Sequence, residues 1–273
     1  MNEANRNLAL RVGSALVLAP LAIYATWRGG VIFAAVCAVV AAVAAHELIS
    51  MIAPVRLPEA YGIAVAATFP LAPWYALGVY PAWAPIALGF AGMGLLVLHL
   101  FGGDLEGVPR RASAVALAWI WIGPVVSSVV SLRLRFGTGW VIMALAATFV
   151  NDTAAYFAGR FLGRHKLLPR ISPKKTWEGF LGGVAGSVAA ALVVRAFDFT
   201  HDLGSLGWTG AALLGLGAAV LGPLGDLSES MVKRATGVKD SGSLIPGHGG
   251  LLDRIDALLF VAPWVWVYAN FLR

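Results

Sequence analysis

The strongest constraint on the fold of this chain is a succession of apolar stretches, each about long enough to cross a lipid bilayer as a helix. Only 12% of the residues are charged, whereas a soluble domain carries about a quarter charged residues. In lipid every backbone polar group must be satisfied within the protein, and a helix does this locally. The sequence therefore predicts an all-α, polytopic transmembrane helical bundle with about nine spans, at residues 12–27, 30–52, 61–79, 83–101, 112–132, 139–159, 178–197, 208–231 and 254–271.

The basic residues indicate how these spans are oriented. Cytoplasmic loops of membrane proteins are enriched in Lys and Arg. With the N-terminus inside, most of the 20 Lys and Arg residues fall in cytoplasmic segments. The exceptions are Arg28, Arg133, Arg135, Arg195 and Arg273. This distribution predicts that both long charged loops, 160–177 and 232–253, face the cytoplasm.

The remaining composition narrows the class of protein. The apolar run after Arg11 is long enough for a full span and shows no cleavage site, so we expect no cleavable signal peptide. Cys37 is the only cysteine, which excludes an intramolecular disulfide and a cysteine metal cluster. The net charge of +6 fits orientation signals and contacts with anionic lipid or nucleotide, and we expect no nucleic-acid partner.

We expect two regions along the chain. N-terminal transmembrane helices occupy residues 1–137, and a C-terminal transmembrane catalytic region occupies residues 138–273 and contains both charged loops. In the first region one acid stands out, Glu47, which lies near the end of a span beside His46. Acids at that depth are often functional. We nevertheless interpret Glu47 as an interfacial acid that is satisfied by water or by His46.

The stretch from Leu224 to Asp256 concentrates charge in an otherwise apolar sequence. Its ends have helical spacing, because Asp226 lies one turn before Ser230 and Asp253 lies three residues before Asp256. Between them runs a glycine-rich loop with basic residues, whose backbone N–H groups can approach an anion closely. Mg²⁺ prefers oxygen ligands and commonly takes one or two carboxylates together with substrate phosphates. The stretch therefore predicts a site for Mg²⁺ and phosphate.

A second polar region runs from Asn151 to Gly179. Asp152 falls inside an apolar helix, and the loop that follows supplies a run of bases before Glu178. We expect Ser172-Pro173 and Thr176 to start the next helix, because such residues cap otherwise unpaired N–H groups. A loop on the positive side of the membrane explains the bases, but it does not explain Asp152 or Glu178.

Both regions carry the motifs of one family. The chain contains Ser230-x-x-Lys233-Arg234, then Lys239-Asp240, then Ile245-Pro246-x-His248-Gly249-Gly250-x-x-Asp253-Arg254-x-Asp256. This pattern resembles the signature of the phosphatidate cytidylyltransferase (CDP-diacylglycerol synthase) family. The runs Asp152–Tyr156, Gly159-Arg160 and Ser172–Gly179 resemble further motifs of that family. The resemblance covers about residues 140–260, and the N-terminal half is similar only in its apolar, many-span character.

The resemblance implies an enzyme of phospholipid biosynthesis that makes CDP-diacylglycerol and pyrophosphate from CTP and phosphatidic acid. It implies Mg²⁺, alone or with a second cation, a homodimer, and a multi-pass protein of the bacterial plasma (inner) membrane whose active site faces the cytoplasm. Both substrates are anions, so catalysis by such an enzyme consists mainly of positioning and charge stabilisation. The attacking phosphate is already ionised at neutral pH, so no Ser-His-Asp or Cys-His set is needed.

Roles for single residues follow from the motifs. The residues expected to take part in catalysis are Asp226, Ser230, Lys233, Arg234, Asp253 and Asp256, and the expected metal ligands are Asp226, Asp253 and Asp256. The residues expected to bind substrate are Lys174, Lys175, Lys239, Asp240, His248, Gly249, Gly250, Arg254 and Asp152. We expect the triphosphate or the lipid head group to be held by Lys233, Arg234, Lys239 and Arg254. For any single base, membrane orientation is an equally good explanation.

Two other functions use similar residues. A CTP-dependent lipid kinase would transfer the γ-phosphoryl group and release CDP, although the complete motif from Ser230 to Asp256 favours nucleotidyl transfer. A polytopic transporter would use the intramembrane acids Asp152 and Asp226 for ion coupling, although no paired inverted repeat is visible.

Overall fold

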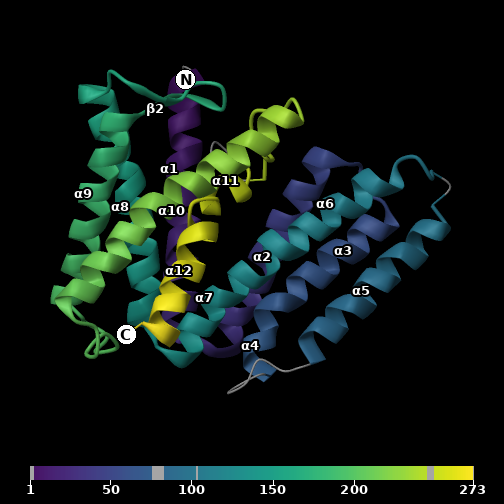
Figure 1. The fold of residues 1–273 in the computed structure, drawn as a ribbon, viewed down its shortest axis with the longest axis horizontal. Helices are drawn as coiled ribbons and strands as arrows, with labels where there is room; N and C mark the ends of the chain where they lie inside the picture. Colours follow the sequence, from purple (N-terminus) through teal and green to yellow (C-terminus); the bar gives the residue numbers. More distant parts are fainter. Residues whose placement is uncertain (1–2, 76–82, 103, 245–248, 273) are drawn as a thin grey trace. The chain divides into compact units, whose positions relative to one another are not determined.

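A computed structural model describes residues 3–75, 83–102, 104–244 and 249–272, and these are almost entirely helical (Figure 1). The chain forms two compact units. Unit 1 comprises Met1–Val130 and Val238–Leu252, and unit 2 comprises Ser131–Gly237 and Asp253–Arg273. The expected all-α class is confirmed. The glycine-rich segment after residue 237 thus belongs to the same unit as the N-terminal helices, although the sequence places it in the C-terminal region.

Unit 1 is built from consecutive helices. They are α1 (Glu3–Arg28), α2 (Gly30–Ile52), α3 (Leu57–Thr68), the short η1 (Phe69–Leu71), α4 (Ala72–Tyr75), α5 (Trp83–Leu100), α6 (Val108–Trp121) and the first part of α7 (Gly123–Arg135). Gly29 and Gly30 have φ of 63° and 57°, a left-handed conformation that glycine adopts without strain, and they separate α1 from α2. Helix α2 packs against α3 and α6, and α3 also packs against α5 and α6.

A buried ionic cluster ties three of these helices together. The Glu59 carboxylate on α3 lies 3.4 Å from Nε2 of His99 on α5 and 3.3 Å from Nε of Arg111 on α6. All three side chains are nearly inaccessible to solvent. The second carboxylate oxygen of Glu59 accepts a hydrogen bond of 2.8 Å from the backbone N–H of Arg56, where α3 begins. Because a buried charge is costly without a partner, these residues depend on one another.

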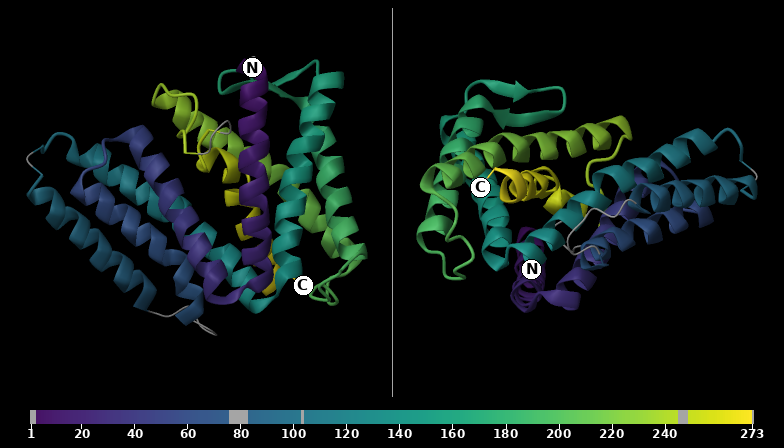
Figure 2. Two further views of the ribbon diagram at one scale, coloured as in Figure 1. Left: turned by 180° about the vertical axis from the view of Figure 1, so that it is seen from behind. Right: turned by 60° about the horizontal axis from the view of Figure 1, so that its bottom comes forward.

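Unit 2 contains the end of α7, then α8 (Thr138–Leu162), the hairpin β1 (Lys166–Leu168) and β2 (Ser172–Thr176), α9 (Trp177–Ala196), α10 (Trp208–Ala235) and α12 (Leu258–Phe271). The one-turn helix α11 (Leu252–Ile255) begins at the last residue of unit 1. Helices α8 and α9 lie side by side along their length, and α10 packs against both of them and against α12 (Figure 2).

Small residues allow the closest of these contacts. On α9, a Cβ atom added at Gly182 or at Gly186 would strike Ala158 or Ala154 of α8. A Cβ atom at Gly215 of α10 would lie 2.6 Å from the backbone of Val188 on α9. Transmembrane helices approach closely through such small residues, because lipid provides no hydrophobic force between them. The packing of α8, α9 and α10 therefore explains glycines that carry no chemistry.

The helices follow most of the expected spans. Among the described residues, five helical stretches are long and apolar enough to cross a membrane: Gly30–Ile52, Val108–Arg135, Thr138–Leu162, Trp177–Ala196 and Trp208–Ala235. The expected span at 112–132 is divided into α6 and α7 at Gly123-Pro124. The expected span at 61–79 becomes α3, η1 and α4, and its last residues lie outside the described ranges. The protein is thus polytopic, and the count of nine spans stays a prediction.

The charged loop after α8 contains a hairpin that the sequence does not predict. Strands β1 and β2 pair antiparallel, with Lys166 opposite Thr176 and Leu168 opposite Ser172. Neither strand shows the apolar–polar alternation that signals a strand. Ser172 and Pro173 lie in β2, so they do not start a helix as expected. The Thr176 hydroxyl does cap α9, because it accepts a hydrogen bond of 3.1 Å from the backbone N–H of Gly179.

Candidate active site

The acids of α10 have the arrangement that their spacing predicts. The Ser230 hydroxyl donates a hydrogen bond of 3.2 Å to Oδ1 of Asp226, one turn earlier on the helix. Glu229 lies on the same part of α10 and is completely buried. Helix α10 thus presents a hydroxyl and two carboxylates within about one turn.

Asp256 is brought to the same place by a glycine. A Cβ atom at Gly225 would lie 3.1 Å from Cα of Ala257 and would strike the backbone of Asp256, so only glycine lets this turn pack against α10. Gly225 directly precedes Asp226 in the sequence. The negative charges of Asp226 and Asp256 interact across this contact. Two carboxylates from distant parts of the chain therefore repel each other here.

A lysine from the hairpin offsets part of this negative charge. Lys175 on β2 places its ammonium nitrogen 2.8 Å from Oδ2 of Asp226. Asp152 on α8 interacts electrostatically with both Lys175 and Asp226. The motif around Asp152 and the motif around Asp226 are far apart in the sequence, and unit 2 brings them together. The hairpin is held in turn by Glu178, whose carboxylate accepts hydrogen bonds from the backbone N–H groups of Arg164 and His165.

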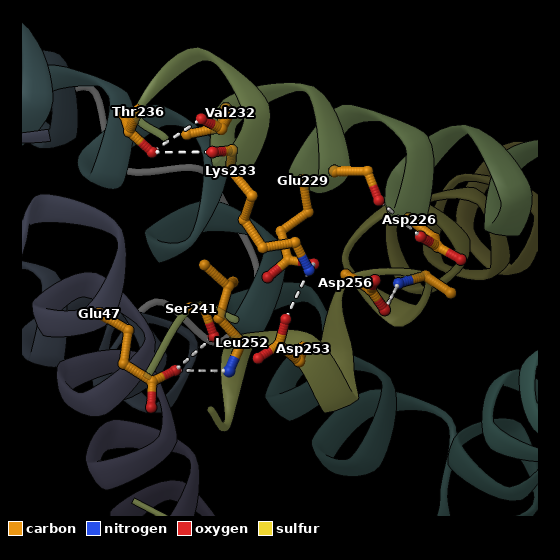
Figure 3. A network of polar contacts seen from close by, with 12 residues as sticks. Glu47, Asp226, Glu229, Val232, Lys233, Thr236, Ser241, Leu252, Asp253 and Asp256 are labelled. Carbon is orange, nitrogen blue, oxygen red and sulfur yellow. Dashed lines mark hydrogen bonds and ion pairs between the residues drawn. The ribbon is translucent and has the colours of Figure 1, made fainter. Parts of the chain in front are cut away.

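A second lysine lies between two more carboxylates. The ammonium nitrogen of Lys233 on α10 is 2.6 Å from Oε2 of Glu229 and 2.5 Å from Oδ1 of Asp253 on α11 (Figure 3). Lys233 is only 8% exposed, and Glu229 is inaccessible. This geometry differs from the expectation that Lys233 holds triphosphate, because its charge is already matched by two buried acids. Glu229 was not expected in the site, although its i, i+4 spacing from Lys233 is a signal for such a pair.

The other predicted residues of the site are more exposed or lie in unit 1. In unit 2, the side chains of Lys174, Arg234 and Arg254 are exposed. In unit 1, Lys239 and Asp240 are exposed, Gly249 is half-buried and Gly250 is buried. Gly249 has φ of 82°, which favours glycine. His248, expected to bind substrate, lies outside the described residues. Unit 2 thus contains Lys174, Arg234 and Arg254 together with Asp152, Lys175, Asp226, Glu229, Ser230, Lys233, Asp253 and Asp256. Lys239, Asp240, Gly249 and Gly250 lie in unit 1.

The interpretation of Glu47 as an interfacial acid is wrong. Its side chain is only 4% exposed, and its carboxylate accepts hydrogen bonds from the Ser241 hydroxyl and from the backbone N–H groups of Leu251 and Leu252. His46 bonds with Ser50 instead. Only the long-range packing within unit 1 reveals these partners, since about two hundred residues of sequence separate Glu47 from them.

The acids of unit 2 could hold Mg²⁺ only together with ligands from outside the protein. Among the described residues, no group of three His, Cys, Asp or Glu side chains is arranged to hold a metal ion by itself. Mg²⁺, however, usually keeps several waters and takes only one or two carboxylates, with substrate phosphates as further ligands. Asp226 and Asp256 supply hard oxygen donors close together, and their mutual repulsion is the kind that a divalent cation relieves.

Comparison with known proteins places this arrangement in a family. The sequence matches the model of the cytidylyltransferase family over residues 9–272. The chain belongs to the cytidylyltransferase family. A relative named phosphatidate cytidylyltransferase from Brucella suis is 33% identical over 266 residues, which cover 96% of this chain and 93% of the relative. Relatives with the same name from Mycobacterium bovis and Haemophilus influenzae are 42% and 40% identical over about half of this chain.

Membership of this family is consistent with the distribution of charge in unit 2. A cytidylyltransferase has to bind a nucleoside triphosphate, and such a site needs both acids that can hold a cation and bases that can face phosphates. In unit 2, Glu229 is buried and Asp226, Asp253 and Asp256 are half-buried. Asp152 and the bases Lys174, Arg234 and Arg254 are exposed. The half-buried Lys175 and the buried Lys233 are instead paired with acids, Lys175 with Asp226 and Lys233 with Glu229.

Proposed function

We propose that this protein is a phosphatidate cytidylyltransferase, which converts CTP and phosphatidic acid to CDP-diacylglycerol and pyrophosphate in phospholipid biosynthesis. The observation that carries the proposal is the similarity to the Brucella suis relative of that name along 96% of this chain. In the reaction, a phosphate oxygen of phosphatidate attacks the α-phosphorus of CTP. The bond between the α-phosphorus and the bridging oxygen breaks, and pyrophosphate leaves.

The chemistry sets two tasks that the residues of unit 2 can perform. Two anionic phosphate groups have to approach each other, so positive charge must lie beside them. The exposed bases Lys174, Arg234 and Arg254 are our candidates for contacts with the triphosphate and the lipid head group. No residue has to remove a proton, because the attacking phosphate oxygen is already ionised. Positioning and charge neutralisation therefore account for the catalysis that we propose.

We propose Asp226, Asp253 and Asp256 as the residues that hold Mg²⁺, with Asp226 as the principal ligand. The cation would neutralise charge on the phosphates and orient them. Ser230 fixes the orientation of Asp226 through its hydrogen bond, and Lys233 does the same for Asp253. Lys175 balances the charge of Asp226 and ties β2 to α10. Each of these residues thus holds a ligand in place rather than touching a reacting atom.

The protein is a membrane protein, and we propose that its site faces the cytoplasm of a bacterial inner membrane, where CTP is available. The excess of bases in the loops 160–177 and 232–253 supports this orientation. We also propose a homodimer, which rests on the family resemblance alone. Cross-linking in native membranes would test the homodimer, because a single band at the monomer mass would exclude it.

The deciding experiment asks which bond of CTP breaks. Purified protein is incubated with phosphatidate and CTP that carries ³²P at the α-position or at the γ-position. Label from the α-position should enter chloroform-soluble lipid, with an equal amount of pyrophosphate formed, and label from the γ-position should stay in water. Entry of γ-label into lipid would show a CTP-dependent kinase. If neither label enters lipid and the protein does not bind CTP, a transporter becomes the better hypothesis.

A further inference from the structure

We propose that Glu47 is a positioning residue, which anchors the glycine-rich segment between α10 and α11 to helix α2. The segment is defined here as 238–244 and 249–252, and it contains the predicted substrate-binding residues Lys239, Asp240, Gly249 and Gly250. Its role in binding CTP rests on the proposed function. The anchor itself rests on the contacts within unit 1.

Glu47 holds both ends of this segment with one carboxylate. Its Oε1 accepts a hydrogen bond of 3.0 Å from the backbone N–H of Leu251, and Oε2 accepts one of 2.8 Å from that of Leu252. Oε2 also accepts a hydrogen bond of 3.2 Å from the hydroxyl of Ser241, near the start of the segment (Figure 3). A single side chain thus closes a loop, and the chain continues from Leu252 directly into Asp253.

Two glycines of the segment are shaped around this carboxylate. A Cβ atom at Gly242 would lie 2.7 Å from Oε1 of Glu47, and one at Gly250 would lie 2.7 Å from Oε2. Both distances are shorter than a carbon–oxygen contact allows, so any side chain would push the carboxylate away from the backbone that it binds. Gly250 was expected to bind substrate. Its closest neighbours in the structure are instead Ser241 and Glu47.

The burial of Glu47 makes the anchor strong. A carboxylate is withdrawn from water only where hydrogen bonds replace its hydration, and here three donors do so. Hydrogen bonds to an ionised acceptor are about twice as strong as neutral ones. A segment of this kind, rich in glycine, would otherwise lose much conformational entropy on ordering. We infer that Glu47 keeps the segment ordered before substrate arrives.

This role predicts a specific kinetic effect of Glu47→Gln. The amide occupies the same volume but has only one acceptor oxygen, and its NH₂ group faces N–H donors. If the segment is ordered in only a fraction of the molecules, the apparent affinity for its ligand is multiplied by that fraction. Bound substrate stabilises the ordered segment, so the rate of the bound enzyme changes little. The KM for CTP should therefore rise about tenfold, with kcat within about threefold of the wild-type value.

Glu59→Gln is the matched control. Glu59 is an equally buried acid of unit 1, but its carboxylate accepts a hydrogen bond from the backbone N–H of Arg56 and lies beside His99 and Arg111. The control should lower thermal stability without changing the KM for CTP. An equal rise in KM for both variants would mean that any lost acid of unit 1 has this effect, and it would overturn the proposal.

Hydrogen exchange without substrate tests the anchor independently of the reaction. In Glu47→Gln, the amides of Leu251 and Leu252 should lose protection while those of α3 and α6 keep theirs. Unchanged protection at Leu251 and Leu252 would overturn the anchor, even if the enzyme is active. Loss of protection throughout unit 1 would make Glu47 a residue of the fold and would also overturn its positioning role. If wild-type protein shows this protection but no cytidylyl transfer, the proposed function fails and the anchor stands.

A second variant covers the case in which Glu47→Gln does not fold. Gly242→Ala leaves α2 unchanged and pushes the segment away from Oε1 of Glu47. Like Glu47→Gln, it should raise the KM for CTP and lower the exchange protection of the Leu251 and Leu252 amides. Wild-type kinetics and wild-type exchange in Gly242→Ala would then refute the proposal.

Discussion

The buried pairing of Lys233 leads to a quantitative prediction for Lys233→Met. Methionine fills a similar volume, but it leaves Glu229 and Asp253 without the ammonium group that now lies 2.6 Å and 2.5 Å from their oxygens. Glu229 is inaccessible to solvent, and the Asp253 side chain is 9% exposed, so water cannot hydrate the two carboxylates that lose their partner. Removing one partner of a buried ion pair costs about 3–5 kcal/mol of unfolding free energy. We expect a loss of that size.

Double-mutant analysis separates this pairing from a general effect of losing lysine. The unfolding free energy is measured by SDS titration in mixed micelles for wild type, Lys233→Met, Glu229→Gln and the double variant. The double variant should be more stable than the sum of the single losses predicts, by about 1–3 kcal/mol, because Glu229→Gln removes one of the two unpaired charges. The control Lys166→Met, on the exposed strand β1, should change stability by less than about 0.5 kcal/mol. Additive losses in the double variant would refute the argument that the pair acts as a unit.

Three further predictions concern the metal, the membrane orientation and the cluster of unit 1. Asp226→Asn should lose most turnover while the protein stays in the membrane, and EDTA should inactivate wild type reversibly on addition of Mg²⁺. Wild-type activity in Asp226→Asn would remove this residue from the site. Cysteines at Lys166 or Ser243 in a Cys37→Ala background should react with an impermeant thiol reagent only after cells are permeabilised. Labelling of both in intact cells would reverse the orientation. Arg111→Met should destabilise unit 1 by about 3–5 kcal/mol, since it leaves a buried carboxylate without its guanidinium partner; an unchanged melting temperature would argue against this.

Some features of the fold and site were accessible from the sequence because their causes are local. An apolar run of about 20 residues has to form a helix in lipid, wherever its neighbours lie. The helical period alone places Ser230 beside Asp226, and the structure shows that hydrogen bond. The cap of Thr176 on α9 follows in the same way from adjacent residues. The family motifs are also linear patterns, so they indicate the family without knowledge of the fold.

The hairpin of β1 and β2 is not predicted by local sequence patterns. Nothing in the residues of β1 and β2 favours a strand, and their pairing is supported by contacts with α9 and α10, such as those of Glu178 and Lys175. Strand preference depends strongly on such context. The partners of the ionisable residues around the site likewise depend on tertiary packing. Their types were predictable, but whether a lysine faces substrate or a buried acid depends on which helices pack together.

Tertiary structure alone decided the partners of Lys233 and Glu47. Each charge is withdrawn from water, and a buried charge is tolerated only where an opposite charge or a set of donors meets it. Asp253 reaches Lys233 because α11 lies against α10 in unit 2, and Leu251 and Leu252 reach Glu47 because the glycine-rich segment packs on α2 in unit 1. Composition determines that such charges must be matched, whereas the packing of distant segments determines which groups match them.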